Sequence, residues 1–332
     1  MGALSEKELR STDRLLSIEI ARITEQAAVA AATLRGKGSE KEADQAAVTA
    51  MRKEMDNIDI RGTIRIGEGE RDEAPMLFIG EEVGSGKGPQ IDIAVDPLEG
   101  TTICAKDMPN ALAVIAMAQD GAMLNAPDVY MEKIAVGPGY SADLLDLDRP
   151  IQDTMKKMAK EKGCNITELT ACILDRPRHS KMISSLREIG VAVRLIGDGD
   201  VAGVIHTTDT EETGIDLYVG IGGAPEGVLA AAAMRCMGGQ ILGRLILDTN
   251  EKKERAERMG VSTTNQIYTA EDMASGSVIF AASGVTDGNM LKGVKFYNNK
   301  IVTDTIVMRS RTGTVRRINT EHRDRSKFHI LG

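Results

Sequence analysis

The sequence predicts an α/β protein made of two parts, each with its own sheet. As far as about residue 147, two long amphipathic helices precede strands joined by short turns, a pattern typical of a mixed or antiparallel sheet backed by helices. From residue 150, strands alternate with helices, which indicates βαβ units in an open sheet. We therefore divide the chain into residues 1–150 and 151–332, with the boundary near 148–165.

The first part begins with two predicted helices. Apolar residues recur at spacings of three and four over residues 12–35, and Gly36 ends this helix. A second helix is expected over Glu40–Asn57, where Asp44 in the first turn has a local explanation as a capping residue that also favours the helix dipole. The strands expected next are 63–66, 76–79, 91–95, 111–118 and 129–136.

The centre of the first part is Asp96-Pro97-Leu98-Glu99-Gly100-Thr101. Pro97 has no N–H for a sheet ladder, so the strand should stop there and leave Asp96 at its carboxyl end. Carboxylates and hydroxyls in such a turn suit hard cations, although an Asp-Pro turn that caps a strand explains the same residues. Upstream, acids gather over residues 67–73, either solvated or holding cations, and the glycines beside Glu68 favour a constrained backbone.

In the second part, three loops follow predicted strands and should share the sheet edge where α/β proteins bind ligands: 175–179, 197–200 and 222–227. Arg176 and Arg178 in the first loop suit a phosphate, although Arg pairs are also common on surfaces. Gly222 and Gly223 let the backbone approach a ligand, while Pro225 replaces the third glycine of a dinucleotide fingerprint and disfavours that function. The strands expected to complete the second sheet are 278–282, 301–308 and 314–318.

Composition restricts the classes of function. The net charge of −8, the 3% of aromatic residues and the absence of Trp argue against nucleic acid as a partner. The four cysteines lack CxxC spacing, as expected of reduced thiols. There is no apolar signal segment and no run of the ~20 apolar residues that cross a bilayer. We expect a cytoplasmic protein that binds no membrane.

These features together predict a phosphate-ester hydrolase without a protein nucleophile. The histidines show no ligand spacing, and no Ser-His-Asp or Cys-His arrangement is readable. Acids clustered in the first part suit divalent metal ions, and the cationic, Gly-rich loops of the second part suit phosphate. Water activated by metal ions would then attack phosphorus.

The residues 96–101 resemble the D-P-[IL]-[DE]-G-T signature of the lithium-sensitive, metal-dependent sugar and inositol phosphatase superfamily. A closer resemblance, to the class II (GlpX-type) fructose-1,6-bisphosphatases, extends in order and with compatible spacing from about residue 15 to about residue 320. The motifs that carry it are residues 66–76, 124–131, 198–202 and 222–228.

The resemblance implies a layered α-β-α-β-α sugar-phosphatase fold with two mixed sheets. It also implies Mg²⁺- or Mn²⁺-dependent removal of the 1-phosphate from fructose 1,6-bisphosphate, as in gluconeogenesis. The implied ligands of two or more divalent ions are Asp44, Glu68, Asp96, Glu99 and Glu226. The implied substrate contacts are Glu99, Gly100, Thr101, Tyr130, Arg176, Pro177, Arg178, Asp198, Gly199, Asp200 and Gly223. Asp72 and Thr101 would act on the attacking water, the hydroxyl passing its proton towards the carboxylate.

One departure from the family pattern concerns the second helix. Glu40 stands where the family usually carries Lys, and Lys41 follows one residue later, so the cationic role is weakened unless Lys41 reaches the site.

Alternative functions remain open. One is hydrolysis of sedoheptulose 1,7-bisphosphate, alone or beside the six-carbon sugar, since one hydroxymethylene gives little binding contrast; an inositol phosphate is another substrate. A third is a non-catalytic sugar-phosphate-binding regulator. An exposed Met- and Ala-rich helix face indicates self-association, and we expect a homo-oligomer, a dimer or tetramer.

Overall fold

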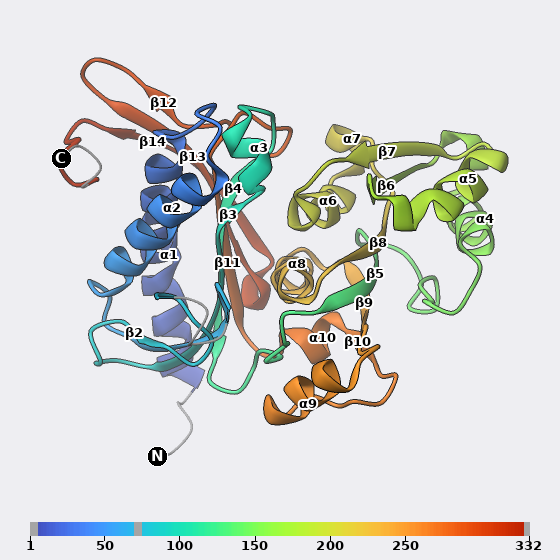
Figure 1. Cartoon of the computed structure of the whole chain (residues 1–332), viewed down its shortest axis with the longest axis horizontal. Helices are drawn as coiled ribbons and strands as arrows, with labels where there is room; N and C mark the ends of the chain where they lie inside the picture. Colours follow the sequence, from blue (N-terminus) through green and yellow to red (C-terminus); the bar gives the residue numbers. More distant parts are fainter. Residues whose placement is uncertain (1–5, 70–74, 329–332) are drawn as a thin grey trace. The chain divides into compact units, whose positions relative to one another are not determined.

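The chain folds into two compact units, and the computed structural model describes its residues 6–69 and 75–328. Unit 1 is Met1–Met123 with Gly276–Gly332, and unit 2 is Leu124–Ser275. Both the blue and the red parts of the chain in Figure 1 therefore belong to unit 1. This division differs from the predicted boundary near residue 150, because the strand at 130–136 pairs within the second sheet and the last strands return to the first.

Unit 1 contains a mixed sheet with the strand order β12-β13-β11-β4-β3-β1-β2, in which β14 pairs with β13. β1 and β3 run parallel, whereas β3 with β4 and β4 with β11 are antiparallel. The strands are β1 (Arg61–Ile66), β2 (Glu82–Val83), β3 (Gln90–Glu99), β4 (Leu112–Gln119), β11 (Val278–Gly284), β12 (Lys295–Phe296), β13 (Ile301–Arg309) and β14 (Thr314–His322).

The prediction that the carboxyl-terminal strands complete the second sheet is wrong. β11 pairs with β4 over its whole length, and β13 and β14 follow it into the sheet of unit 1. β4 and β11 are apolar and buried almost throughout, as central strands covered on both faces must be. Such a sequence fits the centre of either sheet, so the pattern alone does not select the partner.

Two long helices, α1 (Glu6–Ala32) and α2 (Glu40–Met55), pack against each other and on the sheet of unit 1 (Figure 1). The predicted stripe of α1 is confirmed, since Ile20, Ile23 and Ala27 are fully buried. Ser39 begins α2, and its side chain accepts the Glu42 N–H at 3.3 Å. The short helix α3 (Thr101–Ala105) follows β3.

Residues 76–79 do not form the predicted strand. Leu77 has a φ of 55°, and the segment folds back over residues 67–69. The Glu68 N–H donates to the Leu77 carbonyl at 3.0 Å, and the Ile79 N–H donates to the Gly69 carbonyl at 2.9 Å. These bonds hold residues 68 and 69 against residues 77 and 79, an arrangement that the alternation of apolar residues did not reveal.

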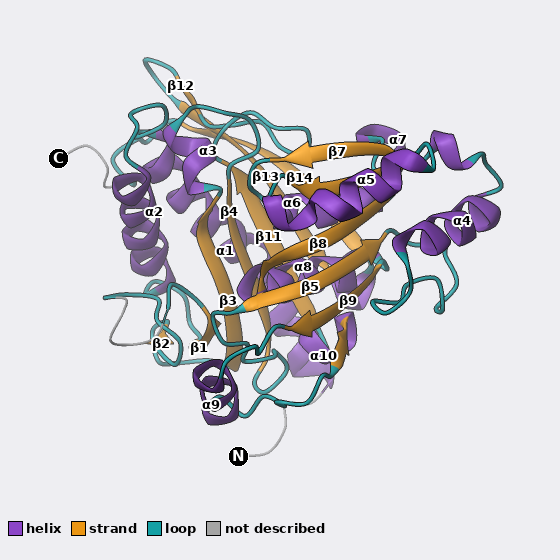
Figure 2. Ribbon diagram, turned by 45° about the vertical axis from the view of Figure 1, so that its right-hand side comes forward, coloured by secondary structure: helices purple, strands orange, loops and turns teal. Residues whose placement is uncertain are grey.

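Unit 2 contains a second mixed sheet, with the order β10-β9-β5-β8-β6-β7 (Figure 2). β6 runs parallel to β7 and to β8, and β5 is antiparallel to β8 and β9. The strands are β5 (Tyr130–Val136), β6 (Thr170–Leu174), β7 (Ala192–Ile196), β8 (Leu217–Gly223), β9 (Gln240–Leu245) and β10 (Ile267–Thr269). The helices are α4 (Ile151–Lys162), α5 (Ser180–Glu188), α6 (Asp200–Ile205), α7 (Thr210–Thr213), α8 (Ala224–Met237), α9 (Asn250–Arg258) and α10 (Ala270–Met273).

The two sheets and their helices confirm the mixed α/β class with two mixed sheets. The Ala-rich segments of α1 and α8 are buried in the folded chain, so they do not form the exposed face from which self-association was predicted. Within the described ranges, no helix has the length and apolar character needed to span a membrane.

Candidate functional site

The predicted metal ligands Asp96 and Glu99 stand on a bulge of β3. The ladder with β4 shifts register between these two residues and resumes with Glu99 opposite Leu112. Pro97 lies within this bulge, where its missing N–H costs no ladder bond, so the prediction that the strand stops before Pro97 is wrong. Carboxylate oxygens of Asp96 and Glu99 lie within 4.8 Å of one another.

The Asp96 side chain also serves the local turn. Its Oδ1 accepts the Leu98 N–H at 3.1 Å, so the turn-capping explanation holds for this one oxygen. A carboxylate has further lone pairs, and a turn bond of this kind fixes its direction. Capping and cation binding are therefore compatible at Asp96.

Glu68 has a strongly raised pKa. Burial raises its pKa, and the negative charges of Asp44 and Asp96 raise it further, to about 8. Gly67 allows the backbone before Glu68 to lie close to Leu77, because a Cβ at position 67 would lie 2.0 Å from the Leu77 carbonyl oxygen. The constrained backbone that the flanking glycines predicted around Glu68 is confirmed.

Asp44 is half-buried on α2, and burial raises the pKa of its carboxyl group. The local explanation of Asp44 as a helix cap is wrong, since Ser39 occupies that position and makes the capping bond. Unit 1 thus gathers acids from α2, from the loop after β1 and from β3. Glu40 and Lys41, where the chain departs from the family pattern, are exposed at the start of α2.

Gly100 and Thr101 connect the bulge of β3 to α3. Gly100 has a φ of 86°, a left-handed conformation that favours glycine, and Thr101 is the half-buried first residue of the helix. The hydroxyl of Thr101 therefore follows the acidic bulge directly. Asp72, the predicted partner of Thr101, lies outside the described residues.

In unit 2, the three predicted ligand loops share one edge of the sheet. β6, β7 and β8 are parallel, and the loops at 175–179, 197–200 and 222–227 follow their carboxyl ends, as predicted. This edge carries the predicted substrate contacts of unit 2. They are Tyr130, Arg176, Pro177, Arg178, Asp198, Gly199, Asp200 and Gly223.

Arg178 is held in place before any ligand binds. Its guanidinium donates to the Ile221 carbonyl from Nε at 3.1 Å and from Nη2 at 2.6 Å, and it lies 4.8 Å from the centre of the Tyr130 ring. Arg176, across Pro177, donates to the carbonyl of Asp175 at 3.0 Å. Both cations stand after the carboxyl end of β6.

His179 joins the loop after β6 to the end of β8. Its Nδ1 lies 2.7 Å from the Leu174 carbonyl oxygen, and its Nε2 accepts the Ile221 N–H at 2.8 Å. A neutral ring with the proton on Nδ1 satisfies both bonds, and burial favours this form by lowering the pKa of His179. Sequence reasoning missed this role because Ile221 is distant along the chain.

Asp198, Gly199 and Asp200 form the start of α6. Gly199 has a φ of 85°, and its N–H donates to Asp198 Oδ1 at 3.1 Å. On the neighbouring loop, the carboxylate of Glu226 folds back over Gly223, where a Cβ would lie 1.9 Å from Glu226 Oε2. A side chain at position 223 would therefore displace the carboxylate of the predicted metal ligand.

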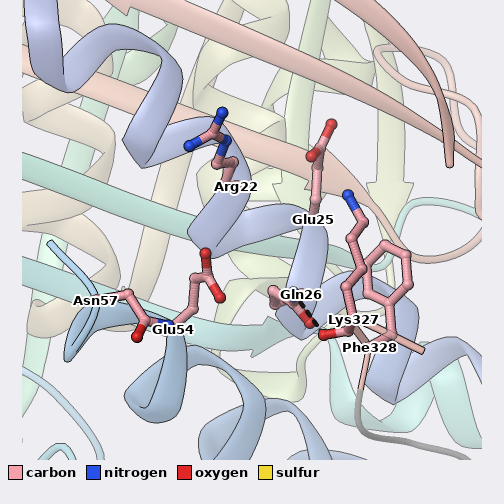
Figure 3. Close-up of a pocket in the computed structure, with 7 residues that line it drawn as sticks. All are labelled: Arg22, Glu25, Gln26, Glu54, Asn57, Lys327 and Phe328. Atoms are coloured by element: carbon pink, nitrogen blue, oxygen red, sulfur yellow. Dashed lines mark hydrogen bonds between the residues drawn. The ribbon is translucent and has the colours of Figure 1, made fainter. Parts of the chain in front are cut away.

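A cavity of about 440 Å³ in unit 1 is separate from these residues (Figure 3). Arg22 and Glu25 of α1 and Glu54 of α2 line it, and the Gln26 side chain donates to the Lys327 carbonyl at 3.2 Å. The residues that line it are Arg22, Glu25, Gln26, Glu54, Asn57, Lys327 and Phe328, and they include no predicted site residue.

Comparison with known proteins identifies the family. Residues 14–322 match the family model described as bacterial fructose-1,6-bisphosphatase, glpX-encoded. A D-fructose 1,6-bisphosphatase class 2/sedoheptulose 1,7-bisphosphatase of Prochlorococcus marinus (strain MIT 9303) is 45% identical over 324 residues, which cover 93% of this chain and 96% of that protein. The protein of the same name from Synechococcus sp. (strain JA-2-3B'a(2-13)) is 42% identical over 335 residues, with the same coverage of 93% and 96%.

Among solved structures, an inositol monophosphatase from Anabaena (Nostoc) sp. PCC 7120 aligns with a TM-score of 0.31 and 12% identity, covering 59% of this chain and 71% of that one. The family model and the curated relatives span nearly the whole chain, and both describe phosphoric monoester hydrolases. The chain therefore belongs to the family of bacterial, glpX-encoded class 2 fructose-1,6-bisphosphatases.

Proposed function

We propose that the chain removes the 1-phosphate of fructose 1,6-bisphosphate by in-line attack of water, with divalent metal ions held by its carboxylates. The observation that carries the proposal is the grouping of Glu68 with Asp44 and Asp96 in unit 1. Burial and the negative charges of these two neighbours raise the pKa of Glu68 to about 8, as expected where carboxyl groups gather at a place for cations. Such an arrangement is costly in a metal-free protein and favourable once divalent ions bind.

The metal ligands in this proposal are Asp44, Glu68, Asp96, Glu99 and Glu226. Their chemistry fits the group, because hard divalent cations such as Mg²⁺ and Mn²⁺ prefer carboxylate oxygens. Bound ions would neutralise the phosphoryl oxygens and lower the pKa of the attacking water. Two or more ions are expected, given that the set holds five carboxylates.

Thr101 and Asp72 act on the attacking water in this proposal. Thr101 begins α3 directly after the acidic bulge, so its hydroxyl can take part in proton transfer beside the phosphate. It passes its proton towards Asp72. Glu99, Gly100 and Thr101 also contact the substrate, where the turn at Gly100 brings backbone N–H groups towards an anion.

The loops of unit 2 bind and orient the substrate. Arg176 and Arg178 neutralise a phosphate, and the fixed guanidinium of Arg178 loses little freedom when it binds. Asp198, Gly199, Asp200 and Gly223 offer carboxylate and backbone groups to the sugar hydroxyls. Tyr130 and Pro177 border the same edge.

A panel of substrates tests the function. Phosphate release is measured from fructose 1,6-bisphosphate, sedoheptulose 1,7-bisphosphate and an inositol phosphate over a range of Mg²⁺ and Mn²⁺ concentrations, with EDTA as control. We expect release from fructose 1,6-bisphosphate that EDTA abolishes. Sedoheptulose 1,7-bisphosphate is a second candidate substrate, because the relatives that are 45% and 42% identical carry both activities in their names. A chain that binds sugar phosphates and releases no phosphate would be the regulator instead.

Single substitutions test the roles. Thr101→Ala should lower kcat by orders of magnitude and leave KM nearly unchanged, and Thr101→Ser, which keeps a hydroxyl, should retain most activity. Glu226→Gln should reduce the number of Mn²⁺ ions bound per chain at equilibrium dialysis. An unchanged kcat for Thr101→Ala removes this residue from the mechanism, and an unchanged Mn²⁺ stoichiometry removes Glu226 from the ligand set.

The predicted dimer or tetramer is retained as part of the proposal. It has its own test, light scattering after size-exclusion chromatography of the full chain. A monomer at micromolar concentration contradicts it.

A further inference from the structure

Lys133 is a buried cation on β5, next to the loops that carry Asp200 and Gly223. Its side chain is 1% exposed, whereas lysine is almost never fully buried unless it is paired. Along β5, Ile134 and Val136 belong to the core beneath α4 and α5. Lys133 alternates with them and lies on the other face of the sheet, next to Gly227 of α8.

The ammonium group joins two predicted substrate contacts. Lys133 Nζ donates to a carboxylate oxygen of Asp200, which is itself only 6% exposed, and to the Gly223 carbonyl at 2.8 Å. The Tyr218 hydroxyl donates to the same Asp200 oxygen at 3.4 Å. The start of α6 and the end of β8 are thereby tied to one point on β5.

Two glycines leave the space that this arrangement needs. A Cβ at Gly222 would lie 2.2 Å from Asp200 Oδ2 and 3.0 Å from Lys133 Nζ. A Cβ at Gly227 would lie 3.3 Å from Lys133 Cδ and 2.5 Å from the sulfur of Met131. Both positions are therefore explained by the path of the lysine side chain as well as by backbone approach to a ligand.

We propose that Lys133 is a positioning residue for the sugar side of the substrate, an inference that rests on the proposed function. It touches no reacting atom. It holds the carboxylate of Asp200 and the carbonyl of Gly223 in a single geometry, so that both loops are ordered before the sugar binds. Preorganisation of this kind lowers the cost of binding, and its loss weakens binding more than the chemical step.

The test compares Lys133→Met with Lys162→Met. Lys162 donates to Asp216 Oδ1 at 2.5 Å, and Asp216 is 3% exposed, so this variant also leaves a buried carboxylate without its lysine. Asp216 precedes β8 and accepts the Thr170 N–H at the start of β6. This pair thus lies at the amino ends of the strands, away from the ligand loops.

Both variants should melt below the wild type, and they should differ in kinetics. For Lys133→Met we expect a KM for fructose 1,6-bisphosphate raised about tenfold or more, with kcat within about threefold of the wild type. For Lys162→Met we expect an unchanged KM. Equal KM values in the two variants would overturn the positioning role.

A second variant decides the matter if Lys133→Met does not fold. Tyr218→Phe removes one hydrogen bond from Asp200 without changing charge, and it should raise KM about two- to fivefold at unchanged kcat. An unchanged KM in this variant would then overturn the proposal. Wild-type kinetics separate the two levels of inference: a wild type that releases no phosphate overturns the proposed function and the positioning role with it, whereas an active wild type confines any failure to Lys133.

Discussion

Replacing Glu68 with Gln should stabilise the metal-free protein. The pKa of Glu68 is raised from 4.5 to about 8, mainly by burial and further by the charges of Asp44 and Asp96. Between pH 4.5 and about pH 8, Glu68 therefore binds more protons in the folded chain than in the unfolded chain. Stability is therefore lost as pH rises through this window, and the loss is complete above about pH 8.

The size of the effect follows from the shift. One pKa unit corresponds to about 1.4 kcal/mol. Ionisation of Glu68 should therefore lower the free energy of unfolding by about 3 kcal/mol between pH 4.5 and pH 7, and by at most about 5 kcal/mol over the full shift. Glutamine has nearly the same shape and carries no charge. It should recover most of this free energy of unfolding and lose the metal ligand.

The assay is guanidinium chloride unfolding of wild type and Glu68→Gln in EDTA at pH 5, 7 and 9. The free energy of unfolding of the variant should exceed that of the wild type by more as pH rises. Saturating Mn²⁺ should stabilise the wild type more than the variant, because an ion that binds the folded state stabilises it. Glu82→Gln, at an exposed position on β2, is the matched control. If the difference in unfolding free energy does not grow between pH 5 and pH 9, burial and the neighbouring acids do not raise the pKa of Glu68.

Three further substitutions have defined outcomes. Arg65→Met should lower the free energy of unfolding by about 3–5 kcal/mol in urea, because it leaves the fully buried Asp92 carboxylate without the guanidinium 2.6 Å away; a loss below about 1 kcal/mol would contradict this. Gly223→Ala should lower kcat/KM about 100-fold, since its Cβ would displace the Glu226 carboxylate, and a wild-type rate would show that this carboxylate is free to move. Burial lowers the pKa of His206 to about 4, so its contribution to stability, at most about 3 kcal/mol, is present above pH 6.5 and is lost as pH falls towards 4. The free energy of unfolding of His206→Gln should therefore fall less than that of the wild type between pH 7 and pH 5. Equal losses in the two proteins would contradict this.

Local signals in the sequence predicted most elements of the fold. Pro150 and Gly163 flank α4, as these residue types commonly flank a helix, and the ligand loops follow parallel strands as expected. Pairing between distant strands was not predictable in the same way. β11 is apolar at nearly every position, so nothing in its own residues distinguishes the sheet of unit 1 from that of unit 2. The prediction that Pro97 ends its strand failed for a related reason. Whether a proline ends a strand or lies in a bulge depends on the partner strand as well as on the proline.

The candidate site shows the same division between local and distant information. Asp44 illustrates it, because its place in the first turn of a helix suggests a cap until Ser39 is seen to make the capping bond. Family motifs, and not local pattern, pointed to its metal role. Lys133 and His179 carry no motif at all, and their partners lie 67 and 42 residues away along the chain. For Lys133, the signal in the sequence was a lysine between the apolar Met131 and Ile134 of β5.

The two buried charges, Glu68 and Lys133, differ in a way that bears on function. Lys133 is matched by Asp200 and Gly223, so its burial is compensated inside the folded chain. Glu68 instead faces further acids, and its raised pKa shows that the fold opposes its ionisation. A chain keeps such a conflict where activity requires it, since a local rule is broken without a structural gain. Under the proposed function, Lys133 would support the site, and Glu68 would be one of the carboxyl groups whose charge bound cations compensate.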